Sequence, residues 1–120
     1  MAGKMVHLEL PAGDTARAKE FYTGLFGWQW QAYEGPQEYH MTRFTEDTGG
    51  AISPSDERGA RIYFDVDDIN AGTARIRELG GQADDPMPVP GMGWFATAQD
   101  TEGNKIGLWQ VDPSAPAPTT

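Results

Sequence analysis

A chain of 120 residues with a formal net charge of −9 and no cysteine excludes several classes of protein. The acidic balance argues against a nucleic-acid partner, because phosphate binding needs a basic face, and without cysteine the chain has no disulfide and no thiolate. No apolar run approaches the roughly 20 residues of a membrane span and the N-terminus lacks the apolar core of a signal peptide, so we predict a cytoplasmic protein with no membrane partner.

The first predicted module begins with a strand that leads into a helix. Residues 5–10 alternate apolar and polar side chains, which is the period of a strand with one buried face. Asp14 is placed to cap a helix over residues 15–26, and Gly27 is placed to end it. Shorter strands are expected around Trp30, over residues 38–45 and over residues 50–53.

The second predicted module repeats this order of signals. A strand over residues 61–66 precedes a helix over residues 69–79, which Asp68 caps and the pair of glycines at 80–81 ends. The repetition indicates an internal duplication. Further strands are expected over residues 82–85, 94–99 and 105–111, with a proline-rich loop over residues 85–93. The modules are assigned to residues 1–55 and 56–112 of one domain, and residues 113–120, rich in proline and alanine, to a disordered tail.

Strand alternation divides the side chains of each module between two faces. The apolar even-numbered residues of the first strand are expected to pack under the helix. The opposite faces carry polar and aromatic side chains, a composition typical of a small-molecule cleft. The predicted ligand-binding residues are His7, Glu9, Trp30, Arg61, Tyr63, Trp94 and Trp109.

The whole pattern resembles the vicinal oxygen chelate superfamily, which includes glyoxalase I, bleomycin-resistance proteins, extradiol dioxygenases and methylmalonyl-CoA epimerase. The resemblance covers about residues 4–111 and is carried by VHLELPAGDTARAKEFYTGLFGW, YFDVDDI, ELGG and PGMGWFATAQDTEGNKIGLWQ. It implies an α+β fold of two tandem βαβββ modules, whose eight strands form a curled mixed sheet around a cleft. It also implies that the chain pairs with a second copy of itself as a homodimer.

Enzymes of this superfamily hold a divalent metal with one side chain from each of four strand positions. The resemblance carries these positions to His7, to the stretch 51–53, to Arg61 and to Gly107. Only His7 offers a ligand there, because Arg61 is a cation and Gly107 has no side chain. We therefore predict no metal site and no other cofactor.

Each candidate residue has a functional and a plainer interpretation. His7 is a general base or a hydrogen-bonding residue of the cleft wall. Arg61 either forms a salt pair with Glu9 or binds a carboxylate or enolate of the ligand. Tyr63 is a proton donor or a packed phenol. The tryptophans stack on a planar or cationic ligand, or they serve packing.

Two functions remain open from the sequence. The first is a metal-free protein that binds a planar or cationic aromatic molecule, like the bleomycin-resistance proteins that the sequence resembles. The acidic charge either favours a cationic ligand or only maintains solubility. The second is an isomerase, a lyase or a cofactor-free enzyme of secondary metabolism, with catalytic candidates His7, Arg61 and Tyr63. The sequence does not decide whether the protein is an enzyme.

Overall fold

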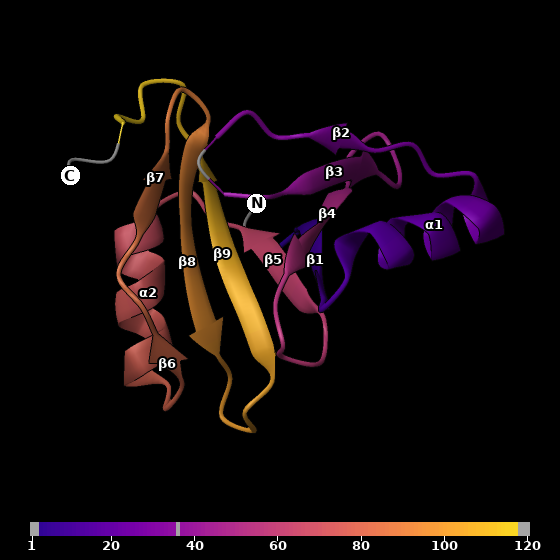
Figure 1. Ribbon diagram of the computed structural model, residues 1–120. Helices are drawn as coiled ribbons and strands as arrows, with labels where there is room; N and C mark the ends of the chain where they lie inside the picture. The colour runs from indigo at the N-terminus through magenta and orange to yellow at the C-terminus, as the bar shows by residue number, and fades with distance from the viewer. Residues whose placement is uncertain (1–2, 36, 118–120) are drawn as a thin grey trace. The chain divides into compact units, whose positions relative to one another are not determined.

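The computed structural model describes residues 3–35 and 37–117, which divide into two compact units. The first, the 7–61 unit, contains helix α1, and the second, the 62–117 unit, contains helix α2 and also includes residues 3–6 (Figure 1). Each unit has its own group of paired strands. Neither described helix has the length and apolar character that a membrane crossing requires.

Parallel pairing of its first and last strands defines the 7–61 unit. Its elements are β1 (Met5–Ala12), α1 (Thr15–Phe26), β2 (Gln31–Ala32), β3 (His40–Arg43) and β4 (Gly49–Pro54). The strand order is β2-β3-β4-β1, in which β1 lies parallel to β4 and the other neighbours are antiparallel. The register sets His7 opposite Gly49 and Glu9 opposite Ala51, so strand β1 presents His7 and Glu9 on one face.

Helix α1 is bounded as its sequence predicts. The Asp14 carboxylate accepts a hydrogen bond from the Arg17 N–H at 3.0 Å, and Gly27 takes the left-handed conformation with φ of 75°. All residues of α1 are described, and none of them is buried. The sequence predicted that helix α1 would pack over the apolar side chains of β1. In the single chain Leu8 and Leu10 of β1 are only half-buried, so this packing is incomplete.

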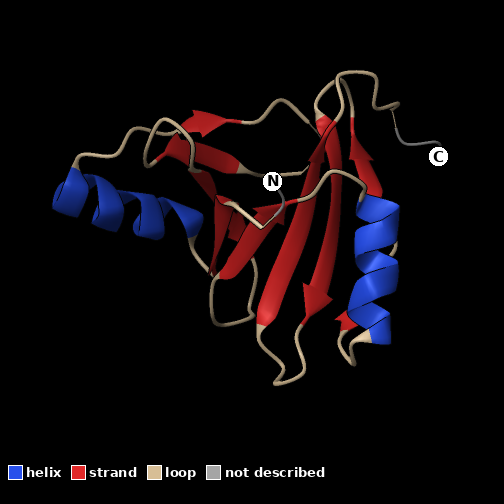
Figure 2. Cartoon of the chain, turned by 180° about the vertical axis from the view of Figure 1, so that it is seen from behind, coloured by secondary structure: helices blue, strands red, loops and turns tan. Residues whose placement is uncertain are grey.

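The 62–117 unit repeats the topology of the first. Its elements are β5 (Arg61–Asp65), α2 (Ile69–Glu78), β6 (Gln82–Ala83), β7 (Met87–Val89), β8 (Gly93–Gln99) and β9 (Lys105–Val111). The strand order is β5-β9-β8-β6, with β5 parallel to β9 and β7 paired to β8. Helix α2 runs alongside the strands of its own unit (Figure 2) and buries Ile69 against Ala96 and Leu108.

The segments at the two ends of the chain both contact the 62–117 unit. The Gly3 N–H donates to the Asp65 carbonyl at 2.8 Å, and the Asp65 N–H donates to the Lys4 carbonyl at 2.9 Å. Ala115 is 6% exposed, and its carbonyl accepts from the Gly91 N–H at 3.0 Å. Of the tail predicted to be disordered, residues 113–117 are described, and Ala115 is the buried residue among them, while residues 118–120 lie outside the described part of the chain.

One short strand was not predicted. The proline-rich stretch 85–93, interpreted as a loop, contains β7, in which Pro88 pairs with Trp94 of β8. Proline lacks a backbone N–H, and it is tolerated in a strand whose outer edge needs no donor. The expected strand around Trp30 is also shorter than predicted, since β2 contains only Gln31–Ala32.

Candidate functional site

A hydrogen-bonded chain of three side chains occupies one face of the 7–61 unit. The Tyr39 hydroxyl lies 2.6 Å from Nε2 of His7 and donates to Oε2 of Glu9 at 2.8 Å. His7 and Glu9 are two residues apart on β1 and so point to the same side, while Tyr39 immediately precedes β3. The sequence predicted His7 and Glu9 as neighbours but missed Tyr39, which connects them.

Burial controls the charge of His7. Removal from water disfavours the imidazolium and lowers the pKa of His7 below its usual 6.5, while the negative charge of Glu9 opposes this shift to a smaller extent. The folded protein therefore holds His7 as a neutral imidazole near pH 7. A neutral imidazole can act as a hydrogen-bond acceptor or as a base.

The residues beside Tyr39 attach this segment to helix α1. Strand alternation turns Glu38 and His40 to the side opposite Tyr39, where Nε2 of His40 lies 2.7 Å from the Glu38 carboxylate. Lys19 Nζ lies 3.3 Å from the other ring nitrogen of His40, and the Thr15 hydroxyl donates to Glu38. We call these four side chains, Thr15, Lys19, Glu38 and His40, the α1 clamp.

Charge and hydrogen bonding within the α1 clamp favour ionised Glu38. The hydrogen bonds from Thr15 and then from His40 are the main reasons that the pKa of Glu38 lies below its usual 4.5. The clamp thus joins α1 to the segment that carries Tyr39 through a group that stays charged over the physiological pH range.

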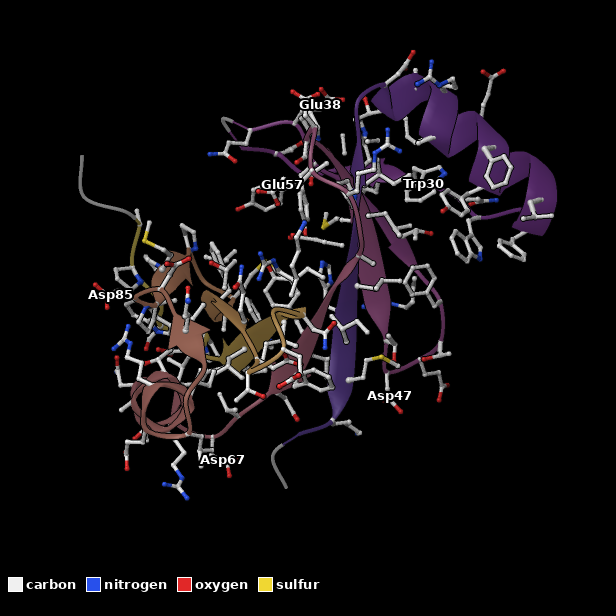
Figure 3. The ribbon with its side chains drawn as sticks, turned by 90° about the horizontal axis from the view of Figure 1, so that it is seen from below. Trp30, Glu38, Asp47, Glu57, Asp67 and Asp85 are labelled. Atoms are coloured by element: carbon white, nitrogen blue, oxygen red, sulfur yellow. The ribbon has the colours of Figure 1, made fainter. Side chains whose placement is uncertain are left out.

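Trp30 contacts the end of helix α1. Its indole N–H donates to the Thr23 hydroxyl at 3.0 Å, and its ring meets the edge of Trp28 at a centroid distance of 6.2 Å. Figure 3 marks Trp30 beside this helix. Trp28 itself stacks with Tyr22 and contacts Phe44, so the structure places Trp30 in an aromatic cluster rather than in the hydrogen-bonded chain of His7.

In the 62–117 unit the predicted site residues occupy both faces of the sheet. Tyr63 is 5% exposed and pairs with Gly107, so Tyr63, Gly107 and Trp109 share one face. Trp94 packs instead against the core under α2, and its indole N–H donates to Asp112 at 2.9 Å. The other predicted residue, Arg61, is half-buried at the start of β5. That the seven residues share one cleft remains a prediction.

The ring of Tyr63 explains why position 107 carries no side chain. A Cβ added at Gly107 would overlap the Tyr63 ring. The strand position at which the superfamily resemblance implies a metal ligand therefore adjoins the ring of the buried tyrosine. Likewise, a Cβ added at Gly93 would overlap the backbone carbonyl of Gln110 and lie 2.7 Å from the ring of Trp109, so the close approach of β9 requires glycine at the start of β8.

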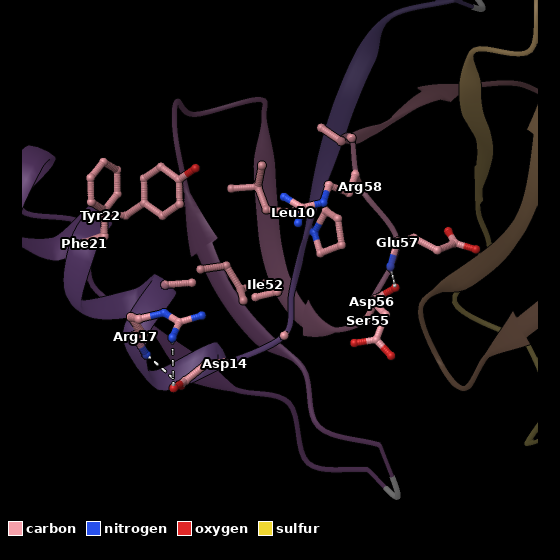
Figure 4. A pocket seen from close by; sticks show the side chains of 16 residues that line it. Leu10, Asp14, Arg17, Phe21, Tyr22, Ile52, Ser55, Asp56, Glu57 and Arg58 are labelled. Atoms are coloured by element: carbon pink, nitrogen blue, oxygen red, sulfur yellow. Dashed lines mark hydrogen bonds and ion pairs between the residues drawn. The ribbon is translucent and has the colours of Figure 1, made fainter.

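A cavity of about 700 Å³ lies on the other side of the first sheet, between the start of α1, the end of β1 and the loop after β4 (Figure 4). Leu10, Ile52 and Phe21 give it an apolar lining, and Asp14 and charged loop residues surround it. None of the predicted ligand-binding residues lines this cavity. It follows from the incomplete packing of α1 on the sheet and is distinct from the face of His7.

The side chains at the expected metal-ligand positions do not suit the divalent metal that the resemblance implies. Such a site needs several imidazole or carboxylate groups that converge on one point. Within the described residues no three His, Cys, Asp or Glu side chains form such a group. His7 and Glu9 are joined through Tyr39, which uses Nε2 of the one imidazole at the expected ligand position.

Comparisons with known proteins identify the fold. Residues 4–108 match the model of the Glyoxalase/Bleomycin resistance protein/Dioxygenase superfamily. A glyoxylase-like domain-containing protein of Didymella fabae is 32% identical over 85% of this chain and 89% of its own length. The anthracycline biosynthesis protein DnrV of Streptomyces peucetius is 28% identical over 90% of this chain but 47% of its own length, so the chain spans about half of that relative.

A solved structure agrees with the family match. Methylmalonyl-CoA epimerase from Mycobacterium tuberculosis superimposes with a TM-score of 0.70 over 96% of this chain and 89% of its own, at 16% sequence identity. At this identity the similarity concerns the fold alone. The predicted α+β fold of two tandem βαβββ modules is thereby confirmed.

Proposed function

Since the chain belongs to the Glyoxalase/Bleomycin resistance protein/Dioxygenase superfamily, we propose that it is a cytoplasmic, metal-free protein that binds a small planar aromatic molecule. The binding face is that of His7, Tyr39 and Glu9. The observation that carries this proposal is the hydrogen-bonded chain itself, with its distances of 2.6 and 2.8 Å. A few convergent polar groups on a partly buried surface with aromatic neighbours are typical of a small-molecule site.

Two features favour a planar and cationic aromatic ligand. The relative DnrV is named for anthracycline biosynthesis, so an anthracycline is the aromatic compound that we propose to test as a ligand. The net charge of −9 attracts a cation over a long range at low ionic strength.

The absence of a metal requirement is part of the proposal. Its support is the chemistry of the expected ligand positions: Gly107 has no donor, Arg61 is a cation, and Nε2 of His7 is bonded to Tyr39. In the proposed function the hydrogen-bonded side chains of His7, Tyr39 and Glu9 supply the polar contact that the resemblance assigns to a metal.

A fluorescence titration tests the binding function. An anthracycline serves as the probe, and we expect saturable binding at low ionic strength that weakens at least roughly tenfold in His7→Gln, as the loss of one buried polar contact implies. Glu9→Gln is the second test variant. Its control is Glu46→Gln, which changes the net charge by the same amount but removes an exposed carboxylate. Binding that is the same in the wild type, His7→Gln and Glu9→Gln would remove the basis of the proposal.

Catalysis is the second candidate function, and the neutral state of His7 favours it. A buried, unprotonated imidazole is suited to abstract a proton from carbon beside a carbonyl. In this version the protein is an isomerase or lyase in which His7 is the base and Arg61 stabilises the enolate. Deuterium exchange into bound ligands, followed by proton NMR in D₂O, separates the two functions, because a binding protein leaves the carbon-bound hydrogens unchanged.

A homodimer is also part of the proposal. Helix α1 exposes the apolar side chains of Phe21, Leu25 and Phe26, which are 61%, 58% and 58% exposed in the single chain. Exposed apolar groups gathered on one helix are typical of a protein–protein contact.

A further inference from the structure

We propose that the α1 clamp is a pH-sensitive latch, which holds helix α1 while His40 is neutral and releases the Lys19 side chain when His40 is protonated. The inference concerns the attachment of α1 to the start of β3, and it does not depend on which ligand the face of His7 binds. It follows from the donors and acceptors on the two sides of the His40 ring.

The His40 ring lies between a cation and an anion. The Lys19 ammonium, 3.3 Å from Nδ1, can only donate, so Nδ1 carries a lone pair in this contact. The ionised Glu38 carboxylate, 2.7 Å from Nε2, only accepts, so Nε2 carries the proton. A neutral imidazole with its proton on Nε2 therefore satisfies both neighbours and links α1 to β3.

Protonation of the ring changes the two contacts in opposite ways. The added proton binds to Nδ1, the nitrogen that faces Lys19. The ring then presents an N–H donor and a positive charge to the ammonium, so this contact becomes repulsive. The contact with Glu38 becomes stronger, because both of its partners are then charged. The ring therefore stays on Glu38, and the latch opens on the side of the helix.

The partners of the ring keep their own charges while His40 titrates. Hydrogen bonds from Thr15 and then from His40 hold the pKa of Glu38 below its usual 4.5, so Glu38 is an anion down to about pH 5.5. A lysine ammonium keeps its charge throughout this range, whereas a histidine changes its charge between about pH 5 and 8. The pH response of the α1 clamp therefore comes from His40.

The strands beside the ring add no titrating group. The side chain of His40 is 15% exposed. The residues that pair with His40 in the neighbouring strands are Ala32 of β2 and Ile52 of β4, and neither of them titrates. Within the described residues, the charged side chains in contact with the ring are those of Lys19 and Glu38.

Helix α1 has room to respond when the Lys19 contact is lost. All residues of α1 are described and none is buried, whereas α2 buries two of its residues. The first half of α1 also borders the cavity of about 700 Å³ beside Leu10 and Ile52. The hydrogen bond between Trp30 and Thr23 holds the other half of the helix. Because no close packing replaces the lost contact, we expect the first half of α1 to become more mobile.

Hydrogen exchange of the backbone amides measures how firmly each helix is held. Protection factors, which correct for the intrinsic effect of pH on exchange, should fall about three- to tenfold for the first half of α1 between about pH 7.5 and 5.5. This is the effect of one lost hydrogen bond. The amides of α2 should change less and are the internal reference. Protection of α1 that is equal at the two pH values would overturn the inference.

The two histidines of the chain, His7 and His40, separate the sources of a pH response. In His40→Gln the response of α1 should disappear, because glutamine does not titrate. In His7→Gln, the matched control, the response of α1 should persist. A response that persists in His40→Gln, or that is lost in His7→Gln, would contradict a latch at His40.

A second variant keeps the test decisive if His40→Gln does not fold. Lys19→Met retains an unbranched side chain but has no ammonium, so the protection of α1 should no longer depend on pH. Arg17→Met is the matched control, since it removes the same charge from a side chain of the same helix that is 79% exposed. It should retain the pH response. An equal response in Lys19→Met and in the wild type would exclude Lys19 as the released group.

The closed state of the latch is tested separately, by long-range ¹H–¹⁵N NMR of the histidine rings at about pH 7.5. We expect His40 to show a protonated Nε2 and an unprotonated Nδ1, since Lys19 donates to the latter. A protonated Nδ1 at this pH would overturn the inference. None of these measurements uses a ligand, so failure of the anthracycline titration would count against the proposed function and leave the latch unaffected.

Discussion

His7 lies in an environment that disfavours its charged form, and this has a consequence for stability. A histidine whose pKa is lower in the folded than in the unfolded chain binds its proton less tightly when folded. Protonation therefore favours unfolding. For His7 the cause is burial, with the charge of Glu9 as the smaller opposing effect.

We predict that the free energy of unfolding decreases as the pH falls below about 6.5. The contribution of His7 is fully present above its unfolded pKa of 6.5 and is lost toward its lower folded pKa. The loss amounts to about 1.4 kcal/mol for each unit that separates the two pKa values. Urea unfolding at several pH values measures it. The decrease should be smaller in His7→Gln and unchanged in Glu46→Gln, and equal slopes in all three proteins would contradict the prediction.

Gly107 is a second single residue with a testable constraint. A Cβ at this position would overlap the ring of the buried Tyr63. We predict that Gly107→Ala lowers the free energy of unfolding by about 1–3 kcal/mol, the usual cost of overpacking. The same substitution in a Tyr63→Leu background should cost less, because the clash involves the ring. Equal costs in the two backgrounds would show that Tyr63 is not the obstacle.

At the scale of elements, helix α1 buries none of its own residues in this chain, so helix propensity contributes more to its stability than it does in a packed helix. Gly24 lies within α1, and a Cβ added there meets no atom within 4 Å. Gly24→Ala should therefore stabilise the protein by about 0.5–1 kcal/mol, through helix propensity alone. Urea unfolding followed by circular dichroism measures this gain, and a loss of stability would indicate that the helix face at Gly24 is in contact with another molecule.

The elements also show how far the sequence determines the fold. Both helices begin at the predicted residues, because Asp14 and Asp68 cap them through contacts only three residues away. Strand β7 was missed because prolines at 86, 88 and 90 suggested a loop, and only its pairing with β8 makes it a strand. Local signals are readable in the sequence, whereas pairing between distant segments is not.

The candidate site was predictable to the same limited extent. Alternation along β1 predicted that His7 and Glu9 share a face. Tyr39 is 32 residues from His7 in the sequence, and their contact depends on the order β3-β4-β1 in the sheet. In an extended segment Tyr39 points to the side opposite Glu38 and His40, and this alternation was readable in the sequence. It did not indicate which strand would lie beside the tyrosine.

At the scale of the whole molecule, the duplication predicted from the sequence is visible in the strand pairing. In each unit the first strand lies parallel to the last one, β1 with β4 and β5 with β9, and the preceding strand joins the last one antiparallel. The helices differ, since α2 buries Ile69 and Thr73 whereas α1 buries none of its residues. One copy of the module therefore has its helix packed, and the other leaves apolar side chains exposed.

This difference predicts where two copies of the chain meet. If α1 contributes to a homodimer interface, Leu25→Glu should raise the dissociation constant of the dimer about tenfold or more, because it introduces a charge into a buried contact. Light scattering after size exclusion, over a range of concentrations, should give twice the mass of one chain for the wild type and a lower mass for the variant. Leu79→Glu is the matched control, since Leu79 follows α2 and is 60% exposed, close to the 58% of Leu25. A wild-type protein with the mass of one chain at every concentration would exclude the dimer, and equal dissociation by both variants would exclude a specific role of α1.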